Sequence, residues 1–211
     1  MHFDRRHELK YRVDSRSIPQ ILAHFGGLGF AEIHRARQVS SVYLDTRDFR
    51  CFWETANGLL PRKKFRFRVY DFAASDFQID FVASFETKVS MPDYRLKKIE
   101  QNRIVNGLTI REFDQGYGIL RPSCLVSYRR RYFSNGEVRM TIDSDLTYSL
   151  FSKAGVVAAK RDQGWLQIVE FKFSSDLVKN EILENFPLVP SQFSKYERAI
   201  DSLYRKSNSI N

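Results

Sequence analysis

The sequence predicts a mainly β fold, in which antiparallel strands form the frame and a few helices lie at its periphery. Three observations support this expectation. Strand patterns with charged residues at alternate positions recur along the chain, a turn sequence joins two of them as a hairpin, and helical patterns are few. With 211 residues, 43% of them hydrophobic, the chain can bury a sizeable core, and we expect one domain over residues 1–206 with a frayed tail at 207–211.

The segment Lys63–Tyr70 has the clearest strand pattern. Successive side chains on a strand point to opposite faces, so Lys64, Arg66 and Arg68 share one face and the residues between them make the other face apolar. Burial of the apolar face fixes the register and aligns three cations, which repel one another unless an anion neutralises them. Further strands are expected at His7–Val13, Ser40–Leu44, Phe81–Val89, Leu125–Phe133, Glu137–Asp143 and Leu166–Phe173.

Turn and capping residues place the ends of several elements. Asn135 and Gly136 predict a tight turn between the strand that ends near Tyr132 and the one that starts at Val138. A first helix is expected over Ile18–Phe25, because a proline lies in its first turn and two glycines follow it.

Two more helices are expected near the end of the chain. One covers about Leu177–Phe186. The other begins at Ser194, where Glu197 completes a capping box. Residues 73–77 and 151–164 show neither the helical nor the strand periodicity of hydrophobic residues and are expected to form long loops.

The charge balance favours an anionic partner. Lys and Arg number 34 against 25 Asp and Glu, a formal net charge of +9, which attracts phosphates, nucleic acids or anionic lipids without choosing among them. Cys51 and Cys124 have no metal-ligand or disulfide spacing. The sequence contains no leader-like apolar segment at its start and no run of about 18 apolar residues, so we expect a soluble, cytoplasmic protein without a membrane span.

Both signs of charge recur on the polar faces of the strands. Glu8 alternates with Lys10, Glu86 with Lys88, and Glu170 with Lys172, each set opposite an apolar face. An ordinary antiparallel sheet with one solvated face explains this pattern, and so does a closed barrel with its charged faces turned inward as a polar tunnel. Asp45 and Asp143 are interpreted as structural carboxylates that orient an arginine or end a strand.

A nucleic-acid binder is a further interpretation of the basic and aromatic composition. Such a protein needs exposed aromatic residues and cations spread along an open groove, without glutamates between them. Glutamates do alternate with the cations here, so we expect no specific nucleic-acid partner.

Eight ordered motifs resemble the VTC-type polyphosphate polymerase domain, a family of the triphosphate tunnel metalloenzymes. They extend over nearly the whole chain, from Arg6 to Ala199, and their number and order make the likeness specific. In chain order the motifs are His7-Glu8-Leu9-Lys10-Tyr11, Ser41-Val42-Tyr43-Leu44-Asp45-Thr46, the alternating cations from Arg62 to Arg68, Phe85-Glu86-Thr87-Lys88, Tyr128-x-Arg130-x-x-Phe133, Val138-Arg139-Met140-Thr141-Ile142-Asp143, Val169-Glu170-Phe171-Lys172 and Phe193-Ser194-Lys195-Tyr196.

The resemblance implies a closed, eight-stranded antiparallel β-barrel tunnel. In this family the triphosphate of ATP binds inside the tunnel with Mn²⁺ or Mg²⁺, and its terminal phosphoryl group passes to a polyphosphate chain. By motif position, the catalytic cations would be Lys10, Arg66, Arg68, Lys88, Arg130 and Arg139; the substrate-binding residues would be Arg62, Lys64, Tyr128, Lys172, Ser194 and Lys195; and the metal ligands would be Glu170 and Glu8. A further basic residue of the family aligns with either Lys97 or Lys98.

Two departures from the wider superfamily limit what the resemblance implies. Related sequences often carry two alternating glutamates before the first lysine, whereas Arg6 stands two residues before Glu8 here, which makes Glu8 the weaker metal ligand. Membrane segments that accompany the domain in fungal complexes are absent, so coupling to uptake would need another protein. An inorganic triphosphatase and a non-catalytic polyphosphate- or nucleotide-binding module remain the alternative functions.

Overall fold

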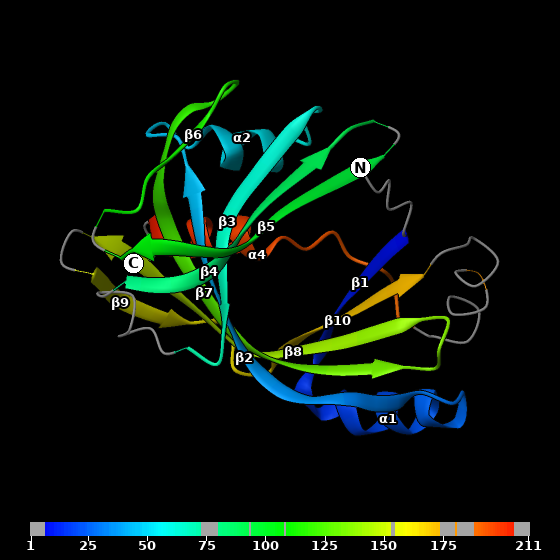
Figure 1. Ribbon diagram of the computed structural model, residues 1–211. Helices are drawn as coiled ribbons and strands as arrows, with labels where there is room; N and C mark the ends of the chain where they lie inside the picture. The colour runs from blue at the N-terminus through cyan, green and yellow to red at the C-terminus, as the bar shows by residue number, and fades with distance from the viewer. Residues whose placement is uncertain are drawn as a thin grey trace, which may run out of the picture.

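A curved antiparallel sheet forms most of the molecule in the computed structural model, which describes residues 7–72, 80–92, 94–107, 109–152, 155–173, 180 and 188–204. The strands of its main path lie in the order β1-β10-β8-β7-β2-β3-β4-β5, and β6 and β9 pair with β7 and β8. Figure 1 shows the sheet curling around a central space. The strands are β1 His7–Asp14, β2 Ala31–Asp45, β3 Arg62–Tyr70, β4 Asp80–Ser90, β5 Arg95–Asn106, β6 Glu112–Asp114, β7 Gly118–Ser134, β8 Arg139–Ser152, β9 Gly155–Arg161 and β10 Leu166–Phe173.

The charged faces of the central strands turn into the curve of this sheet. On β3, Phe65 and Phe67 are buried in the apolar core on one face, while Arg66 and Arg68 lie on the other. Burial extends to charged side chains, because Arg68 is 7% exposed and Glu170 is 6% exposed. The structure therefore has the inward-facing arrangement and not the solvated face of an ordinary surface sheet.

The expected closure into a barrel is not found. Within the described residues, the ladder of paired strands ends at β1 on one side and β5 on the other, and these two strands are not paired. A side-chain contact spans this region, since Nζ of Lys88 on β4 lies 3.4 Å from a carboxylate oxygen of Glu8 on β1. The contact therefore joins β1 to β4, the strand next to the edge strand β5, through side chains alone.

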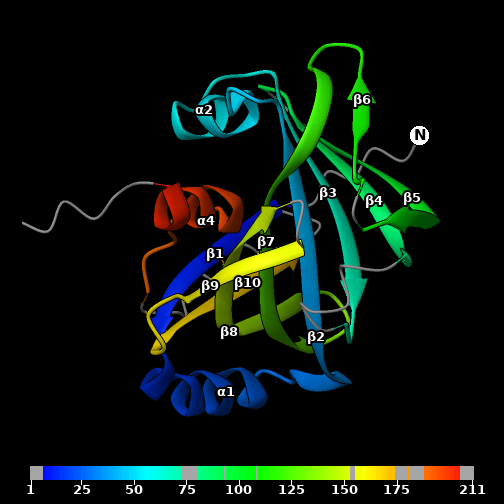
Figure 2. The same ribbon diagram turned by 90° about the vertical axis from the view of Figure 1, so that its left-hand side faces the viewer.

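Helices cover the sheet from outside and at one end (Figure 2). They are α1 Ile18–Gly27, α2 Arg50–Ala56 and α4 Lys195–Tyr204, with a 3₁₀ turn at Ser15–Ser17. Phe25 of α1 packs against Phe171 of β10, with ring centroids 4.9 Å apart. Tyr196 of α4 stacks on Tyr43 of β2 at 4.9 Å, and Ser194 caps α4 by accepting a hydrogen bond from the Glu197 backbone N–H.

The local predictions differ in outcome. The hairpin is confirmed: β7 and β8 pair up to Ser134 and Arg139, and Gly136 has a positive φ of 98°. The long loop expected over residues 151–164 is wrong, because β9 lies within it and pairs with β8. The expected loop at 73–77 lies outside the described residues, as do the tail at 207–211 and all but one residue of the helix expected over 177–186.

Three further elements were not expected from the sequence, namely α2, β5 and β6. Among the helices of the described residues, none has both the length and the apolar character needed to cross a membrane.

Candidate functional site

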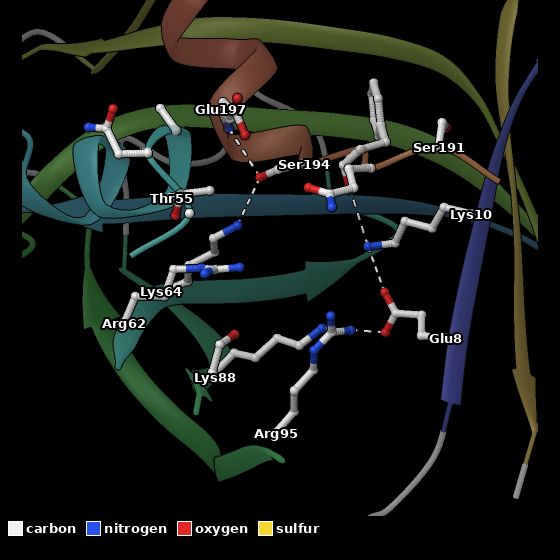
Figure 3. A pocket seen from close by; sticks show the side chains of 16 residues that line it. Glu8, Lys10, Thr55, Arg62, Lys64, Lys88, Arg95, Ser191, Ser194 and Glu197 are labelled. Carbon is white, nitrogen blue, oxygen red and sulfur yellow. Dashed lines mark hydrogen bonds and ion pairs between the residues drawn. The ribbon is translucent and has the colours of Figure 1, made fainter. Parts of the chain in front are cut away.

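Two adjoining cavities lie on the concave face of the sheet. The inner chamber has a volume of about 160 Å³ and the outer chamber about 510 Å³. The two cavities lie side by side, because six residues line both of them, namely Glu8, Lys10, Lys64, Lys88, Phe193 and Ser194. Figure 3 shows the outer chamber, with side chains from β1, β3, β4, α2 and the start of α4 pointing into it. Elements far apart in sequence therefore build two neighbouring cavities.

The wall of the inner chamber is strongly cationic. Nine lysine or arginine side chains line it against three carboxylates. The cations are Lys10, Lys64, Arg66, Arg68, Lys88, Lys97, Arg130, Lys172 and Lys195, and the carboxylates are Glu8, Glu86 and Glu170. This excess of positive charge in a confined space favours a ligand with several negative charges.

Glu86 holds three of these cations in place. Its carboxylate accepts a hydrogen bond of 2.7 Å from Nε of Arg66 and one of 2.9 Å from Nζ of Lys97, and it lies 3.7 Å from Arg68. Burial alone would raise the pKa of Glu86, but Arg66, Arg68 and Lys97 outweigh it and hold the pKa well below its usual range. The carboxylate therefore stays ionised and fixes the guanidinium groups without a ligand.

Asp143 likewise holds cations in place, on the opposite wall of the inner chamber. It accepts two hydrogen bonds from Arg130, at 2.5 and 2.7 Å, and pairs with Nζ of Lys195 at 2.6 Å. The guanidinium of Arg130 also lies 5.2 Å from the ring centroid of Tyr128, whose hydroxyl accepts a hydrogen bond from Arg68. These contacts fit the structural interpretation of Asp143. Asp45 is structural too, because it accepts hydrogen bonds from the backbone at the start of α2.

Glu8 and Glu170 are the carboxylates on adjacent strands β1 and β10. Glu8 pairs with Lys10 at 2.6 Å, and Glu170 pairs with Lys172 at 3.0 Å. Burial and the neighbouring Glu170 raise the pKa of Glu8, but Lys10 and Lys88 lower it to about 2. Burial likewise opposes ionisation of Glu170, and the surrounding cations, Lys172 first, keep its pKa well below the usual value. Both groups are therefore carboxylates at neutral pH.

Among the described residues of the outer chamber, Arg62, Lys64 and Arg95 have no carboxylate partner, whereas Lys10 and Lys88 share Glu8. Nζ of Lys64 donates a hydrogen bond of 2.9 Å to the hydroxyl of Ser194, as Figure 3 shows. Burial and the nearby Lys10 and Lys88 lower the pKa of Lys64 to about 7. Burial also lowers the pKa of Lys88 to about 8. Within the described residues, the Nε atom of Arg62 is buried with no hydrogen-bond partner.

The structure brings together nearly all of the site residues expected from the sequence. Twelve of these residues line the inner chamber, and Arg62 lines the outer one. The twelve are Glu8, Lys10, Lys64, Arg66, Arg68, Lys88, Tyr128, Arg130, Glu170, Lys172, Ser194 and Lys195. Arg139 is the exception, because it is exposed and lines neither chamber.

The structure settles one residue that the sequence left open and adds others that sequence reasoning did not place in the site. Lys97 lines the inner chamber, whereas Lys98 is 75% exposed and pairs with Glu100, which decides between the two lysines. Glu86 and Arg95 also line the chambers. The alternation of Glu86 with Lys88 was a visible signal for Glu86. Arg95 had no comparable signal.

The donor set fits a hard divalent cation that shares its ligands with a substrate. Within the described residues, no group of three or more His, Cys, Asp or Glu side chains is arranged to hold a metal ion. The chain offers the ionised carboxylates Glu8 and Glu170 on neighbouring strands. Mg²⁺ and Mn²⁺ accept one or two carboxylates and complete their shell with water and phosphate oxygens, so two donors suffice.

The fold and the chambers define a class: a curved antiparallel β sheet with a cationic interior. Within that class, the model of the VTC domain matches residues 5–105 and 95–204, so the chain belongs to the VTC domain family. No curated protein matches the sequence.

Solved structures also resemble the chain, among them two putative adenylate cyclases. A putative adenylate cyclase from Vibrio parahaemolyticus, determined by X-ray at 2.25 Å resolution, matches with a TM-score of 0.56 and 17% identity over 95% of this chain and 98% of that one. A putative adenylyl cyclase from Hippeastrum, described as having a dominant triphosphatase activity, matches with a TM-score of 0.46 and 13% identity over 92% and 95% of the two chains. The first likeness shows a shared fold and no more.

Proposed function

We propose that this protein is a polyphosphate polymerase, which transfers the terminal phosphoryl group of ATP to a polyphosphate chain. The observation that carries the proposal is the pair of neighbouring cationic chambers. The inner chamber, with nine cations against three carboxylates, suits a triphosphate, and the larger outer chamber leaves room for a second polyanion. A donor and an acceptor can therefore meet where the two chambers adjoin. Membership of the VTC family supports the same chemistry.

The cations would have different roles in binding, according to the chamber that they line. Arg66, Arg68 and Arg130 would hold the donor phosphates, because their guanidinium groups are already fixed by Glu86 and Asp143. Lys10, Lys64 and Lys88 line both chambers and would hold the phosphoryl group that passes between them. Hydrogen bonds between charged groups contribute roughly 1.5–3 kcal/mol each, so part of this set is enough for tight binding.

Phosphoryl transfer needs alignment and neutralisation of charge more than a covalent catalyst. An oxygen of the terminal phosphate of the acceptor attacks the terminal phosphorus of ATP. The bond from that phosphorus to the bridging oxygen breaks, its electrons stay on the β-phosphate, and ADP leaves. Lys64 and Ser194, which contact each other at the junction, would orient the acceptor for this in-line attack.

Glu170, with Glu8 as the weaker donor, would hold Mn²⁺ or Mg²⁺ beside the phosphates. When bound, such an ion neutralises charge on the transferred group. Lys10 and Lys172 pair with these carboxylates in the structure and would turn to phosphate oxygens when the ion binds. Carboxylates and cations would then both stay paired in the loaded site.

A thermal shift assay tests the binding step. A ligand at 100 times its dissociation constant stabilises a protein by about 2.7 kcal/mol, and a chain of this size gains roughly 2–4 °C per kcal/mol. Tripolyphosphate should therefore raise the melting temperature by about 5–10 °C, and single-stranded DNA at moderate salt by much less. Equal shifts from both ligands would point to an open basic surface and contradict the proposed site.

Incubation with ATP and Mn²⁺ then separates the possible activities. Long polyphosphate and ADP are expected as products. Free phosphate without polymer would identify a triphosphatase, in which water takes the place of the acceptor. Binding without any turnover would identify a non-catalytic polyphosphate or nucleotide module. Either of these two results would overturn the polymerase proposal.

A further inference from the structure

An aromatic and basic cluster continues the inner chamber along the concave face, away from the outer chamber. It consists of Arg37 on β2, Tyr70 on β3 and Tyr132 on β7, which are adjacent strands in the order β7-β2-β3 (Figure 1). None of its residues belongs to the site described above. We call it the tyrosine–arginine cluster.

The strand register places all three side chains on the face that bears the cations. Tyr132 and Arg130 are two residues apart on β7, so they point the same way. Arg37 pairs directly with Arg130, and paired residues share a face. Tyr70 follows Arg68 by two residues on β3, a distance of about 7 Å along a strand. The cluster therefore begins one strand repeat beyond the cations that would hold the donor phosphates.

The contacts within the cluster suit a flat, uncharged ring. The guanidinium of Arg37 lies 6.0 Å from the ring centroid of Tyr70, and Tyr70 is 46% exposed. His34 packs edge-on against Tyr132, with ring centroids 5.7 Å apart. Burial raises the pKa of Tyr132, while Arg130 and Arg37 act in the opposite direction. Both arginines are therefore close to this hydroxyl, one from the chamber and one from the cluster.

The cluster also differs from the chamber in how its polar groups are paired. Within the described part of the chain, Arg37 has no ion pair, and the hydroxyls of Tyr70 and Tyr132 have no hydrogen-bond partner. Arg66 and Arg130, by contrast, are held by carboxylates. Arg37 and both hydroxyls thus keep their hydrogen-bonding capacity for a ligand.

We propose that Arg37, Tyr70 and Tyr132 bind the base of a nucleoside triphosphate whose phosphates lie in the inner chamber. The proposal rests on the function proposed above, because it needs a nucleotide donor. Arginine and tyrosine stack on the faces of bases, and such stacking tolerates different bases. A nucleotide bound in this direction places its terminal phosphate toward the outer chamber, where the acceptor would enter. Because stacking tolerates different bases, GTP should bind nearly as well as ATP.

Titration calorimetry with ATP and with inorganic tripolyphosphate tests the assignment. Loss of base stacking by alanine substitution costs about 1–3 kcal/mol, or roughly 5- to 150-fold in affinity. Tyr70→Ala and Tyr132→Ala should each weaken ATP binding by about tenfold and leave tripolyphosphate binding within about twofold. Tyr70→Phe should keep most of the ATP affinity because it keeps the ring. Phe113→Ala, a change at a side chain 73% exposed on β6, is the matched control and should change neither affinity.

The outcomes separate this proposal from the function on which it rests. Equal weakening of both ligands in the tyrosine variants would mean that the cluster acts on phosphate or on the fold, and unchanged ATP binding would mean that the base lies elsewhere. Either result overturns the assignment. Selective loss of ATP affinity in Arg95→Gln instead would place the base in the outer chamber and overturn it too. A wild-type protein that binds neither ligand would refute the proposed function itself.

Discussion

The inner and outer chambers of this protein use similar cations in different electrostatic settings. In the inner chamber, Glu86 and Asp143 hold Arg66 and Arg130 at hydrogen-bonding distance. In the outer chamber, Lys64 has a serine hydroxyl as its partner, and its pKa is lowered to about 7. The arginines of the inner chamber are preorganised by buried counter-charges, while Lys64, which lines both chambers, has no carboxylate partner among the described residues.

Buried counter-charges explain how a polyanion site can stay folded when no polyanion is bound. Fixed guanidinium groups lose little freedom when a phosphate arrives, so they supply affinity. Lysines with lowered pKa values gain a proton and a partner together, so they respond to pH and to the approaching ligand. The three predictions below challenge this division.

The largest effect is expected for Glu170→Gln. Loss of the carboxylate removes the proposed metal ligand, so turnover of ATP should fall by at least about 100-fold, while tripolyphosphate binding should remain within about tenfold. Product formation with ATP and Mn²⁺ measures the first quantity, and calorimetry measures the second. Glu100→Gln, at a surface carboxylate paired with Lys98, is the control and should leave both unchanged. Wild-type turnover in Glu170→Gln would remove this residue from the metal role.

The next effect compares one arginine from each chamber. Arg66→Ala removes a preorganised contact worth about 1.5–3 kcal/mol, so tripolyphosphate binding should weaken roughly 10- to 150-fold. Arg62→Ala removes a cation of the outer chamber alone and should weaken binding by about threefold at most. Calorimetry at one salt concentration measures both. Equal losses for the two variants would show that the chambers do not differ as described.

The smallest effect is a pH dependence that arises from two lysines lining both chambers. The pKa values of Lys64 and Lys88 are lowered to about 7 and about 8, so both lysines lose their protons as the pH rises through this range. A phosphate prefers the protonated amine, so affinity should be highest below pH 7 and fall several-fold by pH 9. Lys64→Arg keeps its charge and should flatten the profile. The ligand itself titrates in the same way in both experiments. Parallel pH profiles for the wild type and Lys64→Arg would therefore show that Lys64 does not cause the pH dependence.

The fold was predictable where one face of a strand is plainly apolar. The alternation in β3 and β10 gave both the elements and the facing of their side chains. β5 was missed because its polar residues are not confined to alternate positions, and its pairing with β4 determines its structure. Closure was expected from the family resemblance. Local patterns in β1 and β5 carry no information about whether two distant edges meet.

The site was predictable for cations and less so for the groups that hold them. Arg66, Arg68 and Arg130 were found from parity and motif order, and all three line the inner chamber. Glu86 was seen on the correct face but given no role, because a sequence does not show which carboxylate several cations share. Arg139 has the right parity on β8 and pairs directly with Lys172, yet its side chain is exposed and lines neither chamber.

The gap between β1 and β5 has a mechanical consequence. Within the described residues, the Glu8–Lys88 ion pair spans this side of the sheet without a backbone ladder between the two edges. Among the described residues, no backbone hydrogen bonds between β1 and β5 oppose a parting of the wall along this line. In a polymerase of the kind proposed, such an opening would let a long polymer enter and leave sideways instead of being threaded from its end.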